Sequence, residues 1–323
     1  MAGPLNVFCA SGGGSKGAFE GGVLQAICEA GIELHGFVGV STGSIQAGFM
    51  SQAAAGIGPQ RAQLEKLRDL WFGLGGDSAI YAKPALGIVG MLVRVALGKP
   101  GLYTFAPFQD LLERCITSGP RRPARIGIVE LESSKYVACN PSTPSDLRGA
   151  ILASCSIPAF FPPVAPDFVD GGVRNIAPLA TAFNLASELL HDSDEWDRVN
   201  LYVALASPRA VAPDTRAWAH QSLAQVALRA LEILEGENYQ WDINGALEMN
   251  SLLEFFDTHP TYDRPKVLKG KVRADIRLFE PESVPYSALE FDPAKIRAFW
   301  EAGYQKAHAV LARGADGILA LPR

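Results

Sequence analysis

Two short apolar runs, each followed by a glycine-containing turn and a helical pattern, constrain the fold of this chain more than any other feature. The first run, Leu5 to Ala10, leads through three glycines into a helix predicted from about Lys16 to Ala30. The second run, Phe37 to Val40, leads through Ser41 into a helix predicted from about Ser44 to Ala55. Strands that alternate with helices in this way indicate an α/β fold with parallel strands and helical crossovers.

Further predicted elements extend this pattern along the chain. Helices are predicted at 62–72, 85–97, 108–115, 147–155, 218–234, 243–256 and 293–311, and strands at 125–131, 135–139, 167–169, 199–206 and 276–280. The pattern becomes more helical after Pro213, but no flexible linker precedes the change. We therefore expect a single domain over residues 1–323, with a core at about 5–210 and a C-terminal helical portion at about 211–323 packed on it.

The second turn carries the residues Gly39-Val40-Ser41-Thr42-Gly43, which match the nucleophile elbow G-x-S-x-G. A serine on so sharp a turn projects its hydroxyl from the edge of the sheet, and the flanking glycines allow close approach of the chain. The bare pattern also arises by chance in a glycine-rich chain. Its position between a predicted strand and a predicted helix is what favours Ser41 as a nucleophile.

The first turn, Gly12-Gly13-Gly14, presents backbone N–H groups that no side chain covers, and such a run can hold an anion. Beside Ser41, these amides are predicted to form an oxyanion hole, where one donor is worth about 3 kcal/mol of transition-state stabilisation. Lys16 follows the run. It is either a substrate-binding cation near an oxyanion or phosphate, or an exposed lysine at the start of a helix.

The same loop supports a rival hypothesis, because Gly12, Gly14 and Gly17 match the dinucleotide fingerprint G-x-G-x-x-G. That fingerprint requires an acidic residue at the end of the second strand. Glu33 lies before the second strand, and the strand itself ends in Ser41. The loop therefore suits an oxyanion better than a nicotinamide or flavin dinucleotide, and an oxidoreductase is kept as the alternative.

A carboxylate is predicted at the same edge of the sheet, in Asp170-Gly171-Gly172. An isolated Asp-Gly pair is commonly a surface turn, but Phe168 and Val169 are apolar and place Asp170 at the end of a strand. If that strand runs parallel to the one before Ser41, both ends open on one edge. Since no histidine lies near these motifs, a Ser–Asp pair is more economical than a Ser–His–Asp triad.

Four motifs occur together in order, and together they resemble the patatin-like phospholipases. They are Gly-Gly-Gly-Ser-Lys-Gly at 12–17, Gly-Val-Ser-Thr-Gly-Ser at 39–44, Ala-Ser-Cys-Ser-Ile-Pro-Ala-Phe-Phe-Pro-Pro-Val at 153–164 and Asp-Gly-Gly at 170–172. Phe291-Asp292-Pro293 and Gly303-Tyr304 are also similar to the end of that family's sequences. The resemblance covers nearly the whole chain and is weakest at about 57–102 and 212–275.

The resemblance implies a three-layer α/β/α sandwich with a mostly parallel central sheet. It also implies hydrolysis of fatty acyl esters, often of phospholipids or lysophospholipids, without calcium or another cofactor. By the same resemblance, Ser41 matches the nucleophile, Asp170 the catalytic base, and Gly12, Gly13 and Gly14 the oxyanion hole. A non-catalytic lipid-binding protein of the same fold is a further alternative, although such proteins would normally lose the serine or the aspartate.

The most apolar segment, Ala85 to Leu97, allows two interpretations. It is too short to span a bilayer, and Arg94 interrupts it. It could line an acyl channel or form a lid that makes peripheral contact with a membrane. A helix of the core is the more common role for such a segment and is favoured at this stage.

Composition narrows the other possibilities. The net charge is -5 and no long basic run occurs, so nucleic acid is not expected as a partner. The five cysteines are odd in number and form no C-x-x-C, which indicates reduced thiols and a cytoplasmic location. The histidines lack metal-binding spacing, and no signal peptide is expected. The lipid head group, the acyl length and the oligomeric state are not indicated by the sequence.

Overall fold

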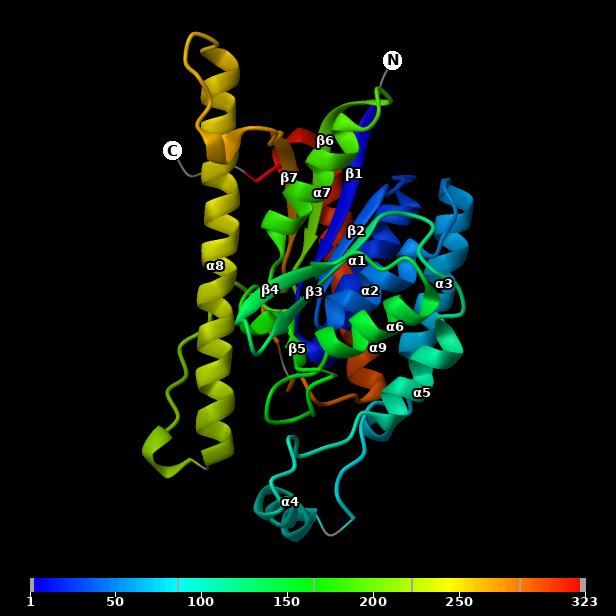
Figure 1. Ribbon diagram of the computed structural model, residues 1–323, viewed down its shortest axis with the longest axis vertical. Coiled ribbons are helices and arrows are strands. Elements are labelled where there is room, and N and C mark those ends of the chain that lie inside the picture. Colours follow the sequence, from blue (N-terminus) through cyan, green and yellow to red (C-terminus); the bar gives the residue numbers. More distant parts are fainter. Residues whose placement is uncertain (1–2, 86, 165, 222, 285, 320–323) are drawn as a thin grey trace.

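The computed structural model describes residues 3–85, 87–164, 166–221, 223–284 and 286–319 (Figure 1). Within these residues the strands form one seven-stranded sheet in the order β4-β3-β2-β1-β6-β7, with β5 paired to β3. The strands are β1 (Gly3–Ala10), β2 (Gly36–Val40), β3 (Ala124–Glu130), β4 (Lys135–Cys139), β5 (Phe168–Asp170), β6 (Trp196–Ala204) and β7 (Ala274–Phe279). Only β4 and β5 run antiparallel to their neighbour, which confirms the predicted mostly parallel sheet.

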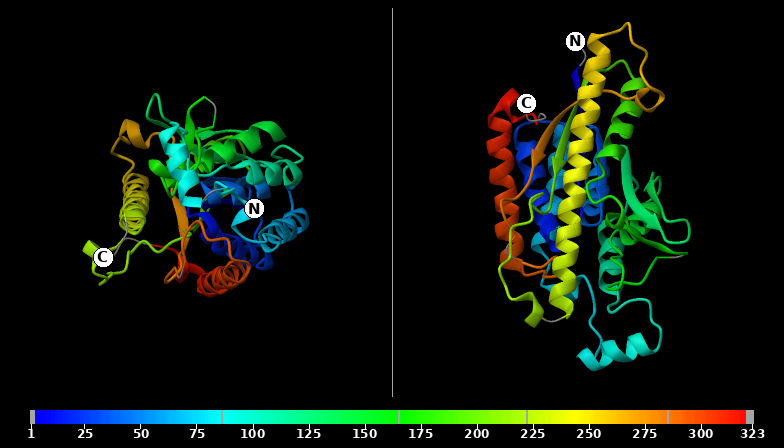
Figure 2. Two further views of the ribbon diagram at one scale, coloured as in Figure 1. Left: turned by 90° about the horizontal axis from the view of Figure 1, so that it is seen from below. Right: turned by 90° about the vertical axis from the view of Figure 1, so that its left-hand side faces the viewer.

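Helices cover both faces of the sheet and make three layers (Figure 1 and Figure 2). Successive residues of β1 alternate between two apolar clusters, because Phe8 and Ala10 face one layer and Val7 and Cys9 face the other. The first layer holds α1 (Ala18–Glu29), α2 (Thr42–Ser51), α3 (Ile57–Phe72), α5 (Ala106–Cys115), α6 (Pro144–Ser154) and α9 (Pro293–Ala312). The second holds α7 (Leu179–His191) and α8 (Leu223–Thr258). The expected α/β/α sandwich is therefore confirmed.

Two helices of the second layer differ from the sequence-based expectation. The helices predicted at 218–234 and 243–256 are one continuous helix, α8, of 36 residues. The helix continues through Gly236, where a Cβ would lie 2.3 Å from a methyl carbon of Val211, so the glycine lets α8 pass close to that segment. Helix α7 was not predicted, although Leu179, Phe183 and Ala186 have helical spacing and are all buried under the sheet.

The direction of β5 is opposite to the one considered from the sequence. Strand β5 is antiparallel to β3, whereas β2 is parallel to β3. Ile128 pairs with Val137 of β4 on one edge of β3 and with Asp170 of β5 on the other. On that second edge, β2 pairs with β3 up to Gly127, which lies opposite Val40. Strand β5 pairs with the next residues of the same edge, so the ends of β2 and β5 face each other. Asp170, the last residue of β5, therefore lies beyond the end of β2 and beside Ser41, even though β5 runs in the opposite direction to β2.

Helix α4 (Gly87–Ala96) lies apart from both layers at one end of the molecule (Figure 1 and Figure 2). The expectation that residues 85–97 form a core helix is therefore wrong for the described part of that segment, which excludes residue 86. Val89, Leu92, Val93 and Val95 are exposed because no layer of the sandwich reaches them. None of the helices in the described ranges has both the length and the apolar character to cross a bilayer.

Candidate active site

Ser41 occupies a strained turn between β2 and α2. Its backbone has φ 50° and ψ −127°, a left-handed conformation that residues other than glycine rarely adopt. The glycines on either side are required by close packing. A Cβ on Gly39 would lie 2.1 Å from the carbonyl oxygen of Gly43, and a Cβ on Gly43 would lie 2.4 Å from the carbonyl oxygen of Ser11. This geometry is the one that the G-x-S-x-G pattern predicts.

The end of α6 and the residues that follow it hold the backbones of Ser41 and Asp170 together. The N–H of Ser41 donates to Ser154 Oγ at 2.8 Å, and Ser154 Oγ donates to the carbonyl of Gly127 at 2.6 Å. Two residues later, the carbonyl of Ser156 accepts from the N–H of Asp170 at 3.1 Å. These contacts give Ser154 a specific positioning role that the sequence suggested only as a generally structural one.

Cys155 also contacts the turn that carries Ser41. Its thiol donates to the carbonyl of Ser41 at 3.1 Å, and Ser44 Oγ donates to the same carbonyl at 2.5 Å. Burial raises the pKa of the Cys155 thiol, so the group stays protonated and acts as a donor. The predicted structural role of Cys155 agrees with these contacts.

Asp170 is buried at the end of β5, next to Ser41. Burial raises the pKa of its carboxyl to about 7, and interactions with the Ser41 side chain and the Gly172 amide oppose that rise. The Gly172 N–H donates to Asp170 Oδ1 at 2.7 Å and so fixes the carboxyl group. Gly171 is required for close packing, because a Cβ there would lie 2.4 Å from a methyl carbon of Val40. A carboxyl with a pKa near neutrality is well suited to accept a proton.

The glycine run after β1 lies beside Ser41, but its three amides are not equivalent. A Cβ on Gly12 would lie 3.0 Å from the Cβ of Ser41. The N–H of Gly12 donates to the carbonyl of Ile176 at 3.0 Å, and the place of Gly12 in an oxyanion hole stays a prediction. In the described part of the chain, no hydrogen bond from the N–H of Gly13 or Gly14 to a protein acceptor is found.

A buried polar network lies beneath the glycine run and was not predicted. Glu20 Oε1 accepts from the N–H of Ser11 at 2.8 Å and from its hydroxyl at 3.2 Å. The carbonyl of Ser11 in turn accepts from the N–H of Gly43 at 2.9 Å. The hydroxyl of Tyr239, from α8, donates to the carbonyl of Gly12 at 2.8 Å. The network ties the glycine run to the elbow, and its one sequence signal is an acidic residue inside an apolar helical stripe.

Lys16 does not take the exposed position that the sequence suggested as one alternative. It is buried rather than exposed, and its ammonium donates to Ser207 Oγ at 3.2 Å. It lines a cavity of about 190 Å³ together with Glu235 and Tyr239. Lys16 does not line the cavity at Ser41, and its role as a substrate-binding cation stays a prediction.

The cavity at Ser41 is apolar and lies next to a second apolar cavity. The first, of about 40 Å³, is lined by Ser41, Gly14 and mainly large apolar side chains. The second, of about 20 Å³, lies between α2, α3 and α5. Four residues line both cavities: Ile45, Ile80, Phe108 and Phe291. The two cavities are therefore adjacent, with shared apolar side chains between them, and extend from the serine toward the first helical layer.

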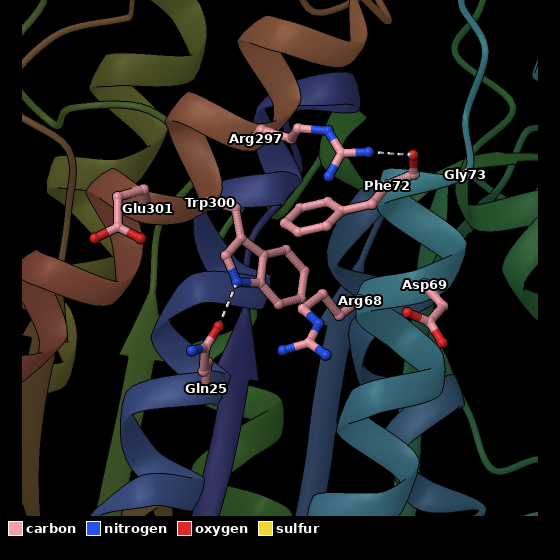
Figure 3. Close-up of a pocket in the computed structure, with 8 residues that line it drawn as sticks. All are labelled: Gln25, Arg68, Asp69, Phe72, Gly73, Arg297, Trp300 and Glu301. Carbon is pink, nitrogen blue, oxygen red and sulfur yellow. Dashed lines mark hydrogen bonds between the residues drawn. The ribbon is translucent and has the colours of Figure 1, made fainter.

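A further hollow lies elsewhere, between α1, α3 and α9 (Figure 3). Its volume is about 600 Å³, and it shares no lining residue with the cavity at Ser41. Inside it, Arg297 lies over the ring of Phe72 at 4.5 Å, and Trp300 Nε1 donates to Gln25 at 2.7 Å (Figure 3). These contacts hold the side chains of the hollow to one another. The hollow lies apart from Ser41 and Asp170.

The described residues contain no group of three or more histidine, cysteine, aspartate or glutamate side chains arranged to hold a metal ion. The polar groups at the site are thus a serine hydroxyl, a carboxyl of raised pKa and two amides of the glycine run. Together they have the donors and acceptors needed for transfer of an acyl group through an oxyanion.

Three comparisons with known proteins bear on this site. The family model described as patatin-like phospholipase matches residues 8–183, a range that includes the glycine run, the elbow and Asp170. A solved structure of VipD from Legionella pneumophila aligns with a TM-score of 0.39 and 12% sequence identity, covering 96% of this chain and 67% of that one. No curated protein sequence matches the chain significantly.

Proposed function

Because the chain belongs to the patatin-like phospholipase family, a family of lipid acyl hydrolases, we propose that Ser41 and Asp170 form the pair that cleaves its substrate. The observation that carries this proposal is the proximity of Ser41, which follows β2, to Asp170 at the end of β5, a buried carboxyl whose pKa is raised to about 7. A carboxylate at its usual pKa near 4 is a weak base, whereas one near 7 accepts the serine proton more readily.

The reaction follows from these groups in two steps. Ser41 Oγ attacks the acyl carbonyl carbon while its proton passes to Asp170. The amides of Gly13 and Gly14 donate to the oxyanion, and its collapse expels the alcohol or lysolipid, which takes the proton back from Asp170. A water molecule, deprotonated by the same aspartate, then attacks the acyl-enzyme. The fatty acid leaves, and Ser41 regains its proton.

The acyl chain is proposed to lie along an apolar path through the two adjacent cavities, which begins at Ser41. Its walls offer no charged group, and transfer of each methylene from water to such a site is favourable by about 0.8 kcal/mol. A head group then stays outside the path, toward solvent. The substrates proposed are acyl esters of phospholipids or lysophospholipids, met by a cytoplasmic protein at a membrane surface.

The dinucleotide alternative is less favoured by the packing of the glycine loop. The N–H of Ser15 donates to the carbonyl of Ala288 at 2.8 Å. Gly14 has φ 60°, and a Cβ there would lie 2.1 Å from the same carbonyl oxygen. The segment around Ala288 thus occupies the place at the start of the helix where a pyrophosphate would bind.

Labelling by a fluorophosphonate tests the proposed nucleophile. We expect the peptide that contains Ser41 to carry the label in mass spectrometry. We also expect the labelling rate to rise with pH through about 7 and then level off, because Asp170 must be ionised to accept the proton. A panel of phospholipids, lysophospholipids and glycerides would then identify the head group. Label on other residues only, or a rate that falls as pH rises through 7, would contradict the proposal.

The acyl path predicts that chain-length preference changes with the size of Leu112, which lines its inner cavity. Leu112→Phe is expected to lower kcat/KM for long p-nitrophenyl esters relative to short ones by about tenfold, because one methylene in a tight pocket is worth about 1–3 kcal/mol. Leu112→Ala is expected to shift the preference toward longer esters. Leu185, buried on the other face of the sheet, provides the control. Leu185→Ala should destabilise the protein without changing the preference.

A further inference from the structure

Helix α4 lies at the tip of a lobe that leaves the body beside the Ser41 cavity. Ile80 and Phe105 both line that cavity, and the chain between them runs out to α4 and back. Backbone hydrogen bonds between Ala82 and Thr104 close the neck of this excursion at 3.0 and 3.2 Å. We call residues 80–105 the α4 lobe, and it projects from one end of the molecule (Figure 1 and Figure 2).

The described surface of the α4 lobe is apolar at its tip. Five large aliphatic side chains are exposed by between 48% and 68%: Val89, Leu92, Val93, Val95 and Leu97. The one charged residue of the helix, Arg94, turns back and donates from Nε to the carbonyl of Gly101 at 2.9 Å. A cluster of this kind is costly in water, and in soluble proteins it marks a surface that another phase or molecule covers.

The charge of the lobe distinguishes it from the other exposed apolar side chains. From Ser78 to Gln109 the sequence has no acidic residue, and its charged residues are Lys83, Arg94 and Lys99. Helix α8 also exposes apolar side chains, among them Ile233 and Leu252 at 51% each. However, α8 has one arginine and many acidic residues: Glu232, Glu235, Glu237, Asp242, Glu248, Glu254 and Asp257. An anionic surface would attract the lobe and repel α8.

We propose that the α4 lobe inserts its apolar tip into the surface of a phospholipid bilayer and so holds the Ser41 cavity near the lipid. An apolar helix with basic flanks is the type that lies in the bilayer interface. A second copy of the chain is a weaker candidate, because stable dimers commonly bury about 800 Å² per partner. A helix of ten residues, roughly 15 Å long, offers much less on one face.

The lobe is also attached to the wall of the cavity. The N–H of Leu102 donates to the carbonyl of Ala159 at 3.0 Å, and the N–H of Tyr103 donates to that of Phe160 at 2.8 Å. The next residue of that segment, Phe161, lines the Ser41 cavity and stacks on Phe105. Anchoring the lobe in lipid would therefore place this wall at the membrane surface. The benefit for catalysis rests on the proposed function, whereas the binding itself does not.

Sedimentation with phosphatidylcholine vesicles that contain some phosphatidylglycerol tests the proposal on the full chain. Leu92→Asp/Val95→Asp is expected to weaken partitioning by about 100-fold, since two aliphatic side chains can no longer enter the hydrocarbon. The control Ile233→Asp/Leu252→Asp changes two side chains on α8 that are also exposed, by 51% each, and should leave binding unchanged. For the wild type, we expect omission of phosphatidylglycerol or addition of salt to weaken binding.

Two outcomes would overturn the membrane contact. One is equal vesicle binding by wild type and the α4 variant. The other is a dimer in light scattering that the α4 variant dissociates while vesicle binding persists. Hydrolysis of the soluble ester p-nitrophenyl butyrate, expected to be equal in the α4 variant and wild type, separates this test from the proposed function. If neither protein cleaves that ester, the chemistry at Ser41 is wrong, and the vesicle result still decides the role of the lobe.

Discussion

Replacing Ser41 by alanine is expected to lower kcat for ester hydrolysis by about 10⁴- to 10⁶-fold and to abolish fluorophosphonate labelling, because the acyl-enzyme can no longer form. The fold should persist. The alanine keeps the backbone N–H that donates to Ser154, and it meets the same backbone strain that serine already bears at φ 50°. The measurement is the rate of p-nitrophenyl ester hydrolysis, with the melting temperature as the check on folding.

Ser51→Ala is the matched control for this substitution. Ser51 is also buried on α2, and its hydroxyl donates to the carbonyl of Gly48 at 2.8 Å, at the far end of the helix from Ser41. Its loss should cost about 1 kcal/mol of stability and no activity. A Ser41→Ala protein that is folded and hydrolyses esters at the wild-type rate would remove Ser41 from the mechanism.

Asp170→Asn is expected to lower kcat by about 10²- to 10⁴-fold and, at the same time, to stabilise the protein above pH 7. Burial raises the pKa of Asp170 from 3.8 to about 7, so the folded chain keeps a proton that the unfolded chain releases in that range. The contribution of this group to the free energy of unfolding is thus fully present below about pH 4 and is lost as pH rises through 7. Asparagine has no such dependence, so the variant should gain roughly 2–4 kcal/mol at pH 8 and progressively less toward pH 4.

Asp242→Asn separates the two effects of that prediction. Asp242, on α8, is a second carboxyl whose pKa burial raises to about 7, and it accepts from the N–H of Ala177 at 3.2 Å. Its replacement should also raise stability at pH 8, but it should leave ester hydrolysis close to the wild-type rate. Urea unfolding at pH 5 and pH 8, together with the hydrolysis rate, measures both quantities. Full activity in Asp170→Asn, or an equal loss in Asp242→Asn, would contradict the assignment of the base.

The sequence predicted those parts of the fold that depend on local pattern. The runs before Gly12 and Ser41 become β1 and β2, and each is followed by a helix, because apolar strands and glycine turns act over a few neighbouring residues. The mostly parallel sheet follows from that repetition. The strained turn at Ser41 was predictable for the same reason, since its flanking glycines are needed within the turn itself.

The features that the sequence did not predict depend on distant partners. The direction of β5 is set by pairing with β3, and three residues of strand carry no sign of it. The amide of Gly12 is engaged by Ile176, and the ammonium of Lys16 by Ser207, both far along the chain. Likewise, whether an apolar helix such as α4 is buried depends on whether a layer covers it. Its composition alone fits both the core and an exposed lobe.

The head-on meeting of β2 and β5 along one edge of β3 makes the spacing of Ser41 and Asp170 independent of the excursion at residues 80–105. Both strands are registered against the same third strand, so the gap between Ser41 and Asp170 is defined by consecutive positions, Gly127 and Ile128. An excursion such as residues 80–105 can be lengthened, trimmed or exchanged upstream of β3 without altering that gap. Changes in this excursion can therefore alter how a substrate reaches Ser41 while Ser41 and Asp170 keep their spacing.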